Sequence, residues 1–498
     1  MAIEEGNKGS ASTRPGAAAD RASGRRGRAL SRRRFLGVAA GSLAGGALVA
    51  PTAAGQRPGV RTPSAAGGRP RARNVIFMIA DGMSMGTLTL ASMMHERAHG
   101  RPCHWCSLWS DPAARRALVR TESADSLVTD SAAAGSAWSI GQRVNNGALN
   151  ITPDGRQMQP ILARLHERGV RTGSVTTTSL TDATPASFMA VAPSRRMFDT
   201  IARQIAQGPY DVVLGGGAEH FPSELTDAPN LHVVTTAQQL RQTPGSLPPQ
   251  ARLMGLFAGG HTPYELDRPD SVPDLATMTW VAIDRLHRLS HQADGGQGGF
   301  FLQVEGGRVD HAAHANDACA MLHDMLAFDR AVGIALRYAR KSNDTLVVVT
   351  TDHGNANPGL TVYNKAASDG LARIENARRS FAWIFDELRQ RTGEPDITLA
   401  RIVREAIGVQ LEQEHARWAA DSIFDRVRRD GFDQRNNASS VLGSVLANHL
   451  GVSFLSKNHT SDMVEAVAFG PGSEALPPLV HITDLHGLVT SAQAVANL

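Results

Sequence analysis

Asp130 and Ser131 stand directly before a run of small residues in TDSAAAGSAWSIG, which begins at Thr129. The run is typical of a helix start, where a serine or aspartate is most often an N-cap. A serine in the first turn of a helix also lies where backbone N–H groups receive an anion. Ser131 is therefore either a cap or a nucleophile, and its neighbours in the sequence do not decide between the two.

Other residues with metal-binding side chains follow short apolar runs. In chain order these runs and the residues after them are NVIFMIA with Asp81, RTGSVTTTSLT with Asp182 and Thr184, GFFLQV with Glu305, and DTLVVVTT with Asp352 and His353. Asp310 and His314 follow Glu305 with the spacing D-x-x-x-H, which places both on one face of a helix. Singly, each residue is explained as a turn former, a cap or a surface residue.

Taken together, these residues predict a multinuclear hydrolytic centre. Mixed oxygen and imidazole ligands favour Zn²⁺, whereas carboxylates with a threonine hydroxyl favour Mg²⁺. Unpaired carboxylates gathered at one buried edge are costly, so positive charge must lie among them.

The apolar runs themselves indicate the fold that positions these side chains. They are continuous rather than alternating, as in strands buried on both faces of a mostly parallel sheet. In such sheets ligands bind beyond the carboxyl ends of the strands. We expect an α/β fold, a three-layer sandwich with a central, mostly parallel sheet.

The charge of the chain is divided unevenly. Residues 1–73 carry 14 Lys and Arg against 3 Asp and Glu, a charge of +11, so the total of +4 leaves −7 for residues 74–498. The excess of basic residues therefore lies in residues 1–73, the N-terminal leader. It does not indicate a nucleic-acid partner. The hydrophobic fraction of 42% is that of a globular protein.

The leader resembles a twin-arginine export signal. SRRRFLG contains Arg32 and Arg33, and the Gly/Ala-rich run VAAGSLAGGALVA after it is too short and too weakly apolar to span a bilayer. We expect a signal peptide over residues 1–55, a linker over 56–73 and a catalytic domain over 74–498. The mature chain would be periplasmic or secreted, without a transmembrane anchor.

Three cysteines exclude a disulfide-built scaffold. Cys103 and Cys106 form a lone CxxC, open to interpretation as a redox pair, half of a zinc site or a local disulfide, of which we favour the disulfide. Cys319 is expected to be a buried small residue.

Six motifs occur in order from about Asn74 to near the C-terminus: VIFMIADGM, VTDSAAAGSAWSIG, TDATPASFMAVAPSR, VEGGRVDHAAH, VTTDHGN and KNHTSDMVEAVAFGPGS. Their combined order and spacing resemble the alkaline phosphatase family. The resemblance implies hydrolysis of small phosphate monoesters, a homodimer, and two Zn²⁺ with one Mg²⁺ per chain. It also implies that Ser131 is the nucleophile and becomes a phosphoserine.

The resemblance assigns ligands as well. The zinc that activates the attacking water would be held by Asp310, His314 and His459. The zinc that activates the Ser131 oxygen would be held by Asp81, Asp352 and His353. The magnesium would be held by Asp81, Thr184 and Glu305, with Asp182 contributing directly or through water.

Substrate-binding residues follow from the same resemblance. Arg195, which closes the TDATP motif, would clamp the phosphate, with Arg196 as the adjacent candidate, and Asp130 would orient Arg195. His311 would contact phosphate through water and titrate near neutrality, so that it tunes product release and the pH optimum. The alternative is that His311 packs beside His314 without a role.

Residues 358–455 interrupt the family pattern. Leu371, Ile374, Phe381, Ile384 and Leu388 are spaced to line one helical face, and two further amphipathic stretches follow. This helical insertion is expected to bound the substrate entrance, extend a dimer interface or cover the sheet edge.

Several rival functions remain to be separated. A Ser-His-Asp esterase would need a G-x-S-x-G turn, and a sulfatase would need C/S-x-P-x-R; neither surrounds Ser131. A phosphodiesterase of the same superfamily would share both zinc sites. A phosphate- or metal-binding protein without catalysis is the alternative from another class.

Overall fold

The computed structural model describes residues 71–243, 245–292, 298–426, 433–435 and 437–493. The expected signal peptide and all of the expected linker except residues 71–73 lie outside the described residues. Within the described part, no helix is both long enough and apolar enough to cross a membrane.

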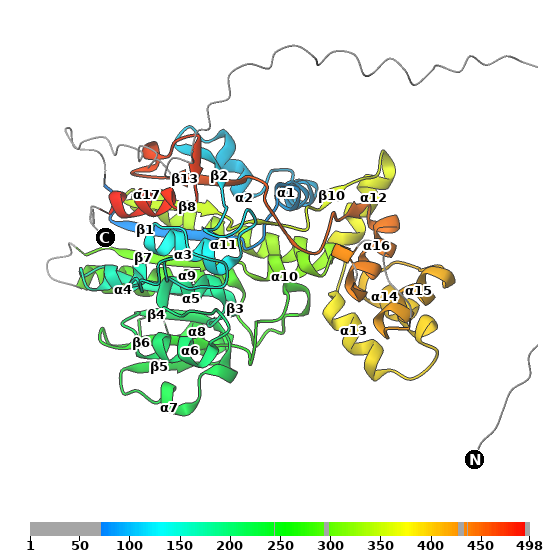
Figure 1. Cartoon of the computed structure of the whole chain (residues 1–498), viewed down its shortest axis with the longest axis horizontal. Coiled ribbons are helices and arrows are strands. Elements are labelled where there is room, and N and C mark those ends of the chain that lie inside the picture. Colours follow the sequence, from blue (N-terminus) through cyan, green and yellow to red (C-terminus); the bar gives the residue numbers. More distant parts are fainter. Residues whose placement is uncertain (1–70, 244, 293–297, 427–432, 436, 494–498) are drawn as a thin grey trace, which may run out of the picture. The chain divides into compact units, whose positions relative to one another are not determined.

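A ten-stranded sheet forms the centre of the domain (Figure 1), in the order β14-β2-β13-β8-β1-β7-β3-β4-β6-β5. β13 runs antiparallel to its neighbours β8 and β2, and the other pairs are parallel. The strands are β1 Asn74–Ile79, β2 Ala114–Arg120, β3 Arg171–Ser179, β4 Val212–Gly216, β5 Leu231–Val234, β6 Arg252–Leu256, β7 Phe300–Glu305, β8 Thr345–Thr350, β13 Val464–Phe469 and β14 Leu479–His481. Two short antiparallel pairs join β9 Gly354–Asn355 to β12 His459–Thr460 and β10 Gly359–Leu360 to β11 Val452–Ser453.

Helices cover both faces of the sheet. They include α1 Met85–His99, α3 Ser131–Ile140, α4 Ile161–His166, α5 Ala183–Met189, α6 Phe198–Gln207, α9 Leu275–Gln292, α10 Arg308–His314, α11 Ala318–Ser342 and α17 Asp484–Ala492. Further helices outside the predicted insertion are α2 His104–Ser107, α7 Ser223–Thr226 and α8 Ala237–Gln242.

The central strand shows why three layers form. All of β1 is buried, and its side chains alternate between two hydrophobic cores. Ile76 and Met78 belong to the core beneath α1, α9 and α11, whereas Phe77 belongs to the core beneath α3, α4 and α5. Phe77 contacts Trp138 of α3 edge-on with 5.3 Å between ring centroids. A strand that buries both faces needs a layer of helices on each side, which confirms the predicted sandwich.

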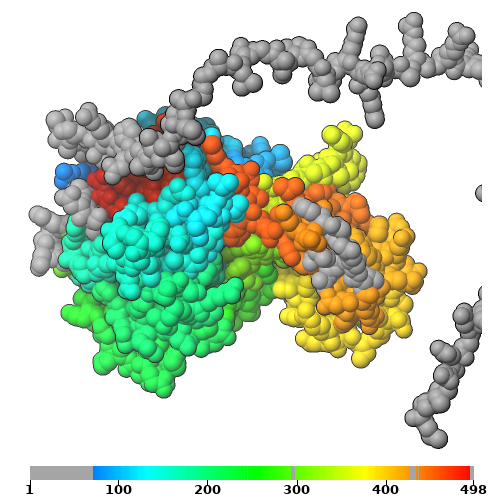
Figure 2. Space-filling model, viewed as in Figure 1, coloured from blue at the N-terminus to red at the C-terminus, as the bar shows by residue number. Residues whose placement is uncertain are grey.

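Among its described residues, the region predicted as a helical insertion contains five α-helices: α12 Lys365–Glu375, α13 Phe381–Gln390, α14 Pro395–Ile407, α15 Gln413–Ile423 and α16 Ala438–Leu450. Figure 2 shows them gathered together in yellow and orange. The prediction of one continuous helical face is wrong, because the chain breaks between α12 and α13. Ser380 caps α13 by accepting a hydrogen bond from the backbone of Trp383, which starts a new helix. The predicted apolar residues are nevertheless all buried.

The favoured disulfide between Cys103 and Cys106 is also wrong, since both are free thiols. Cys103 instead caps α2, where its Sγ accepts a hydrogen bond from the backbone N–H of Cys106. Cys319 is fully buried, as predicted.

Candidate active site

Four neighbouring strands end at one edge of the sheet, and each ends in a predicted ligand or is followed by one within three residues. Asp81 follows β1, Asp352 follows β8, Glu305 is the last residue of β7, and Asp182 lies three residues beyond β3. The register sets Ile79 of β1 beside both Glu305 and Thr350. Because parallel strands end at the same edge, side chains distant in sequence meet there.

Ser131 opens helix α3 but does not cap it. The cap is Asp130, whose Oδ1 accepts a hydrogen bond of 3.0 Å from the backbone of Ala133. The hydroxyl of Ser131 is thus released from backbone pairing, and its Oγ lies 3.3 Å from Nε2 of His353. Ser131 is 3% exposed and His353 has no exposed surface.

This contact is not that of a catalytic triad. Asp352 Oδ2 also faces Nε2 of His353, at 3.0 Å, and Asp81 Oδ1 lies 3.9 Å from the same atom. The other ring nitrogen, Nδ1, is buried without a hydrogen-bond partner among the described residues. A triad needs serine and aspartate on opposite nitrogens. Here serine, two carboxylates and one nitrogen converge on a single point, as the ligands of a cation do.

A second cluster lies between α10 and β12. Asp310 Oδ2 is 3.3 Å from His314 Nε2, Asp310 Oδ1 is 3.6 Å from His459 Nε2, and the two imidazole nitrogens are 3.1 Å apart. Although burial alone would lower it, the Asp310 carboxylate raises the pKa of His314 to about 9. The α10 helix begins after Gly307, so Asp310 is not its cap, and the predicted shared face of Asp310 and His314 is confirmed.

The third group of predicted ligands is deeply buried. The Thr184 hydroxyl donates to Asp81 Oδ2 at 3.3 Å, and Thr178 donates to Glu305 Oε2 at 3.3 Å. Burial raises the pKa of Glu305 to about 8, and burial with the neighbouring Asp352 raises that of Asp81 well above its ordinary value. Such shifts indicate carboxylates gathered without a compensating charge.

The donor atoms fit metal ions. Asp81 Oδ1, Asp352 Oδ2 and Glu305 Oε1 are buried without hydrogen-bond partners among the described residues. Buried orphan carboxylate oxygens are rare unless a cation completes them. Asp81, Asp352 and His353 have ligand atoms within 4.8 Å of one another, as do Asp310, His314 and His459. Nitrogen and oxygen donors of this kind suit Zn²⁺, and the all-oxygen group around Glu305 and Thr184 suits Mg²⁺.

Arg195 lies between the two acids predicted to surround it. Its Nη1 is 3.1 Å from Asp130 Oδ2, and its Nη2 is 3.0 Å from Asp182 Oδ1. Although burial alone would lower it, these two carboxylates raise the pKa of Arg195. Arg196 is exposed, and its backbone N–H donates to Oγ of Ser194 at 3.3 Å, so Arg195 rather than Arg196 lies between these acids.

His311 lies near Asp182, with Nε2 3.8 Å from Asp182 Oδ2. Burial, the charge of Arg308 and the nearby His261 lower its pKa to about 3. The expectation that His311 titrates near neutrality is therefore wrong, because a buried imidazole beside a guanidinium stays neutral.

Two residues of this site were missed in the sequence. His261 lies beyond the end of β6, with Nδ1 3.8 Å from Asp182 Oδ2, and its ring centroid is 4.4 Å from that of His311. Arg308 places Nη1 2.7 Å from Nδ1 of His311. The strand-end rule applied to RLMGLFAGGH would have found His261; no local pattern singles out Arg308.

Comparison with known proteins finds similar sequences and a similar solved structure over most of the chain. A model of the alkaline phosphatase family matches residues 72–495. Streptomycin-6-phosphate phosphatase of Streptomyces griseus is 35% identical over 367 residues, covering 64% of this chain and 80% of the relative. Alkaline phosphatase 4 of Bacillus subtilis is 29% identical over 433 residues, 84% of this chain and 88% of its own. The crystal structure of Thermus thermophilus alkaline phosphatase superposes with a TM-score of 0.77 at 31% identity, covering 85% of this chain and 91% of the other.

Proposed function

Because the chain belongs to the alkaline phosphatase family and is a phosphate-monoester hydrolase, we propose that it works with bound metal ions and through a phosphoserine at Ser131. The observation that carries this proposal is the convergence of Ser131 Oγ and of two carboxylates on Nε2 of His353. A cation satisfies that convergence, whereas a proton relay does not.

Two zinc ions and one magnesium ion fit the donor groups. The first zinc would be held by Asp310, His314 and His459, and the second by Asp81, Asp352 and His353. The magnesium would be held by Asp81, Thr184 and Glu305, with Asp182 direct or through water. When bound, the ions supply positive charge that favours the alkoxide form of a nearby hydroxyl and offsets the charge of phosphate oxygens.

The residues of the chain perform the remaining work. Arg195 presents a planar guanidinium to two phosphate oxygens, and Asp130 and Asp182 hold it in place. Ser131 Oγ attacks phosphorus as the ester P–O bond breaks and the alcohol leaves. Water then cleaves the phosphoserine, which releases inorganic phosphate and restores Ser131.

A single series of assays distinguishes the proposed function from its rivals. Purified mature chain is analysed for bound metal and assayed with p-nitrophenyl phosphate and bis-p-nitrophenyl phosphate at alkaline pH. About two zinc and one magnesium per chain, with chelator-sensitive cleavage of the monoester, supports the proposal. Preference for the diester would favour a phosphodiesterase, and metal without turnover of either ester would favour a binding protein.

The natural substrate is a further question for the same assay. One relative is named a streptomycin-6-phosphate phosphatase and is 35% identical. Phosphorylated aminoglycosides therefore belong among the first monoesters to test, beside sugar and nucleoside monophosphates. A kcat/KM for the aminoglycoside ester far above the others would assign this substrate class.

The insertion over residues 358–455 is proposed to bound the mouth of the site. Its helix α13 is hydrogen-bonded to the segment that carries proposed zinc ligands. The backbone N–H of Phe381 donates to Asp317 at 2.6 Å, and Asp317 lies three residues after His314 in the chain. Ser380 donates from its backbone to Asp267 at 3.2 Å. A variant with a shortened insertion that keeps its metal but changes its preference among monoesters would support this role.

We further propose that residues 1–55 export the folded chain by the twin-arginine route to the periplasm or the medium, and that the mature protein is a homodimer. Lysine in place of Arg32 and Arg33 should retain the unprocessed chain in the cytoplasm. Sedimentation of the mature chain measures its oligomeric state.

A further inference from the structure

The histidines around the site differ in what their Nδ1 atoms do. Nδ1 of His314 lies 2.5 Å from the carbonyl oxygen of Lys457, and Nδ1 of His459 lies 3.0 Å from that of Thr129. A carbonyl oxygen only accepts, so in each ring Nδ1 carries the proton and donates it. In the neutral ring, which is the form of imidazole that binds a metal, Nε2 then keeps its lone pair.

His261 and His311 show the opposite arrangement. The backbone N–H of Ser179 donates to Nδ1 of His261 at 3.1 Å. Nη1 of Arg308 lies 2.7 Å from Nδ1 of His311, and a guanidinium only donates. In both neutral rings Nδ1 accepts, so the proton must be on Nε2.

This difference changes how the cluster of Asp182, His261 and His311 is interpreted. Its ligand-type atoms lie within 4.8 Å of one another, as in the two groups proposed to hold zinc. Yet neither imidazole has a lone pair to give, since one nitrogen accepts a hydrogen bond and the other carries a proton. Asp182 Oδ1 is also engaged, by Arg195 at 3.0 Å and by the backbone of Ala183 at 2.7 Å.

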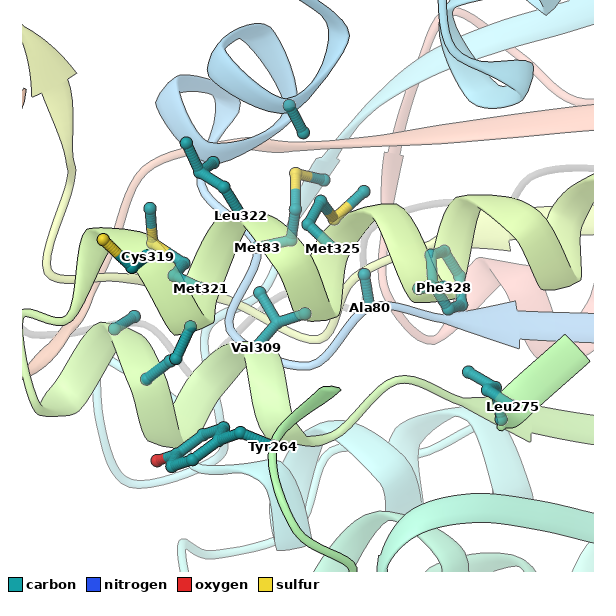
Figure 3. Packing of buried hydrophobic residues seen from close by; sticks show 14 of the residues in the cluster. Ala80, Met83, Tyr264, Leu275, Val309, Cys319, Met321, Leu322, Met325 and Phe328 are labelled. Atoms are coloured by element: carbon teal, nitrogen blue, oxygen red, sulfur yellow. The ribbon is translucent and has the colours of Figure 1, made fainter. Parts of the chain in front are cut away.

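Arg308 is itself held firmly in place. Its Cζ lies 3.8 Å from the ring centroid of Tyr264, and its backbone N–H donates to Thr177 Oγ1 at 3.2 Å. Tyr264 is buried, and Figure 3 shows it beside α10. The same view shows Val309 of α10 facing α11, the helix against which α10 packs. These contacts restrict the Arg308 side chain and hold its guanidinium beside Nδ1 of His311.

We propose that Arg308 is a positioning residue that holds His311 as the Nε2–H tautomer. His261 and His311 then offer N–H donors to phosphate oxygens or bound water, and they bind no metal ion together with Asp182. The inference rests on the proposed function, because Arg195, the proposed phosphate clamp, shares Asp182 with this cluster. The Nε2–H tautomers would explain why these histidines, which lie beside the proposed magnesium site, do not bind zinc.

The first test reads the tautomer directly. Long-range ¹H–¹⁵N spectra of the holoenzyme with ¹⁵N-histidine, with the His311 signal assigned by its loss in His311→Gln, should show a proton on Nε2 and none on Nδ1. Arg308→Met should shift His311 towards the Nδ1–H form, and Arg308→Lys should restore the original form. Arg288→Met, which removes an exposed arginine paired with Asp284 on α9, is the matched control.

The second test counts metal. With excess zinc, Arg308→Met should bind one zinc ion more than the wild type, and its inhibition constant for inorganic phosphate should rise about fivefold, as for one lost hydrogen bond. Arg308→Lys should resemble the wild type in both measurements. If Arg308→Met does not fold, Tyr264→Leu, which removes the ring beneath the guanidinium, should shift the tautomer and the zinc count in the same direction.

A wild-type His311 with its proton on Nδ1, or the same tautomer and zinc count in wild type and Arg308→Met, would overturn the inference. Neither reading depends on turnover. A chain that shows the expected tautomer but hydrolyses no monoester would reject the proposed function alone.

Discussion

The hydroxyl of Ser131 and Nε2 of His353 lie 3.3 Å apart, in a site where His353 has no exposed surface. The two residues are separated by 222 positions in the chain. The ring of His353 stacks on that of His459 with 3.6 Å between centroids, which links the two groups proposed to hold zinc. The proposed nucleophile thus lies against the place where both groups meet.

Ser131→Ala should remove turnover while the protein stays folded. The substitution deletes only Oγ, and loss of a covalent nucleophile lowers kcat on the order of 10³-fold or more. Kinetics with p-nitrophenyl phosphate and a thermal melt measure the two effects. Acid quenching of the wild type with substrate should yield a phosphopeptide that contains Ser131. The control is Ser110→Ala, which replaces an exposed serine and should keep both the turnover and the phosphopeptide. Undiminished activity in Ser131→Ala would reject the mechanism.

Arg195→Lys should weaken phosphate binding more than catalysis at saturation. A lysine cannot reproduce two parallel hydrogen bonds to phosphate, and each hydrogen bond to a charged group contributes about 2 kcal/mol. KM and the inhibition constant for phosphate should therefore rise at least about tenfold. Arg196→Lys next to it, at an exposed position, should leave both constants unchanged. Equal effects of the two substitutions would show that Arg195 does not clamp phosphate.

Removal of metal should destabilise the folded chain. Asp81, Asp352 and Glu305 each have a buried carboxylate oxygen without a hydrogen-bond partner in the described part of the chain, and uncompensated buried charge is costly. Treatment with a chelator should lower Tm by several degrees and abolish turnover, and zinc with magnesium should restore both. Ser131→Ala should keep the full metal-dependent change in Tm, which separates metal binding from catalysis. An unchanged Tm after verified metal loss would contradict the ligand assignment.

Gly82→Ala should impair the site through a steric clash. A Cβ at Gly82 would lie 2.4 Å from Asp310 Oδ1, and its φ of +66° is unfavourable for alanine. Gly100→Ala is a matched control, because Gly100 has a φ of +68° and open space around its Cβ position. Both variants should lose about 1 kcal/mol from the backbone, and only Gly82→Ala should also lose zinc. Equal zinc content in the two variants would contradict this prediction.

Asp324→Asn should stabilise the protein at alkaline pH. Burial raises the pKa of Asp324 from 3.8 to about 8, although Arg308 and the backbone N–H of Glu265 oppose the shift. Between these values the folded chain binds the extra proton and the unfolded chain does not, so the wild-type free energy of unfolding falls as pH rises. Asparagine carries no charge and avoids this loss.

The gain in Tm for Asp324→Asn over the wild type should therefore be larger at pH 9 than at pH 5. Asp284→Asn, at a carboxylate on the surface of α9 paired with Arg288, is the control and should show no such gain. A lower Tm for Asp324→Asn at pH 9 would mean that Asp324 is ionised and needed by Arg308.

Much of the site could be predicted because each strand is encoded by a short, continuous stretch of the sequence. Continuous apolar runs indicate buried parallel strands, and their polar ends must share one edge, so Asp81, Glu305 and Asp352 meet as expected. Asp310 and His314 were predictable for the same kind of reason, since helical spacing places them on one face.

The sequence by itself thus determined the mostly parallel sheet, the edge where the proposed ligands gather and the family. Only the tertiary structure decided that Asp130 rather than Ser131 is the cap, that Arg195 rather than Arg196 faces the site, and that Cys103 caps a helix. It also decided which histidine nitrogens keep a lone pair. Strand and helix periodicity are set by neighbours in the chain, whereas a hydrogen-bond partner such as Arg308 for His311 or Thr129 for His459 depends on where the fold places each donor and acceptor.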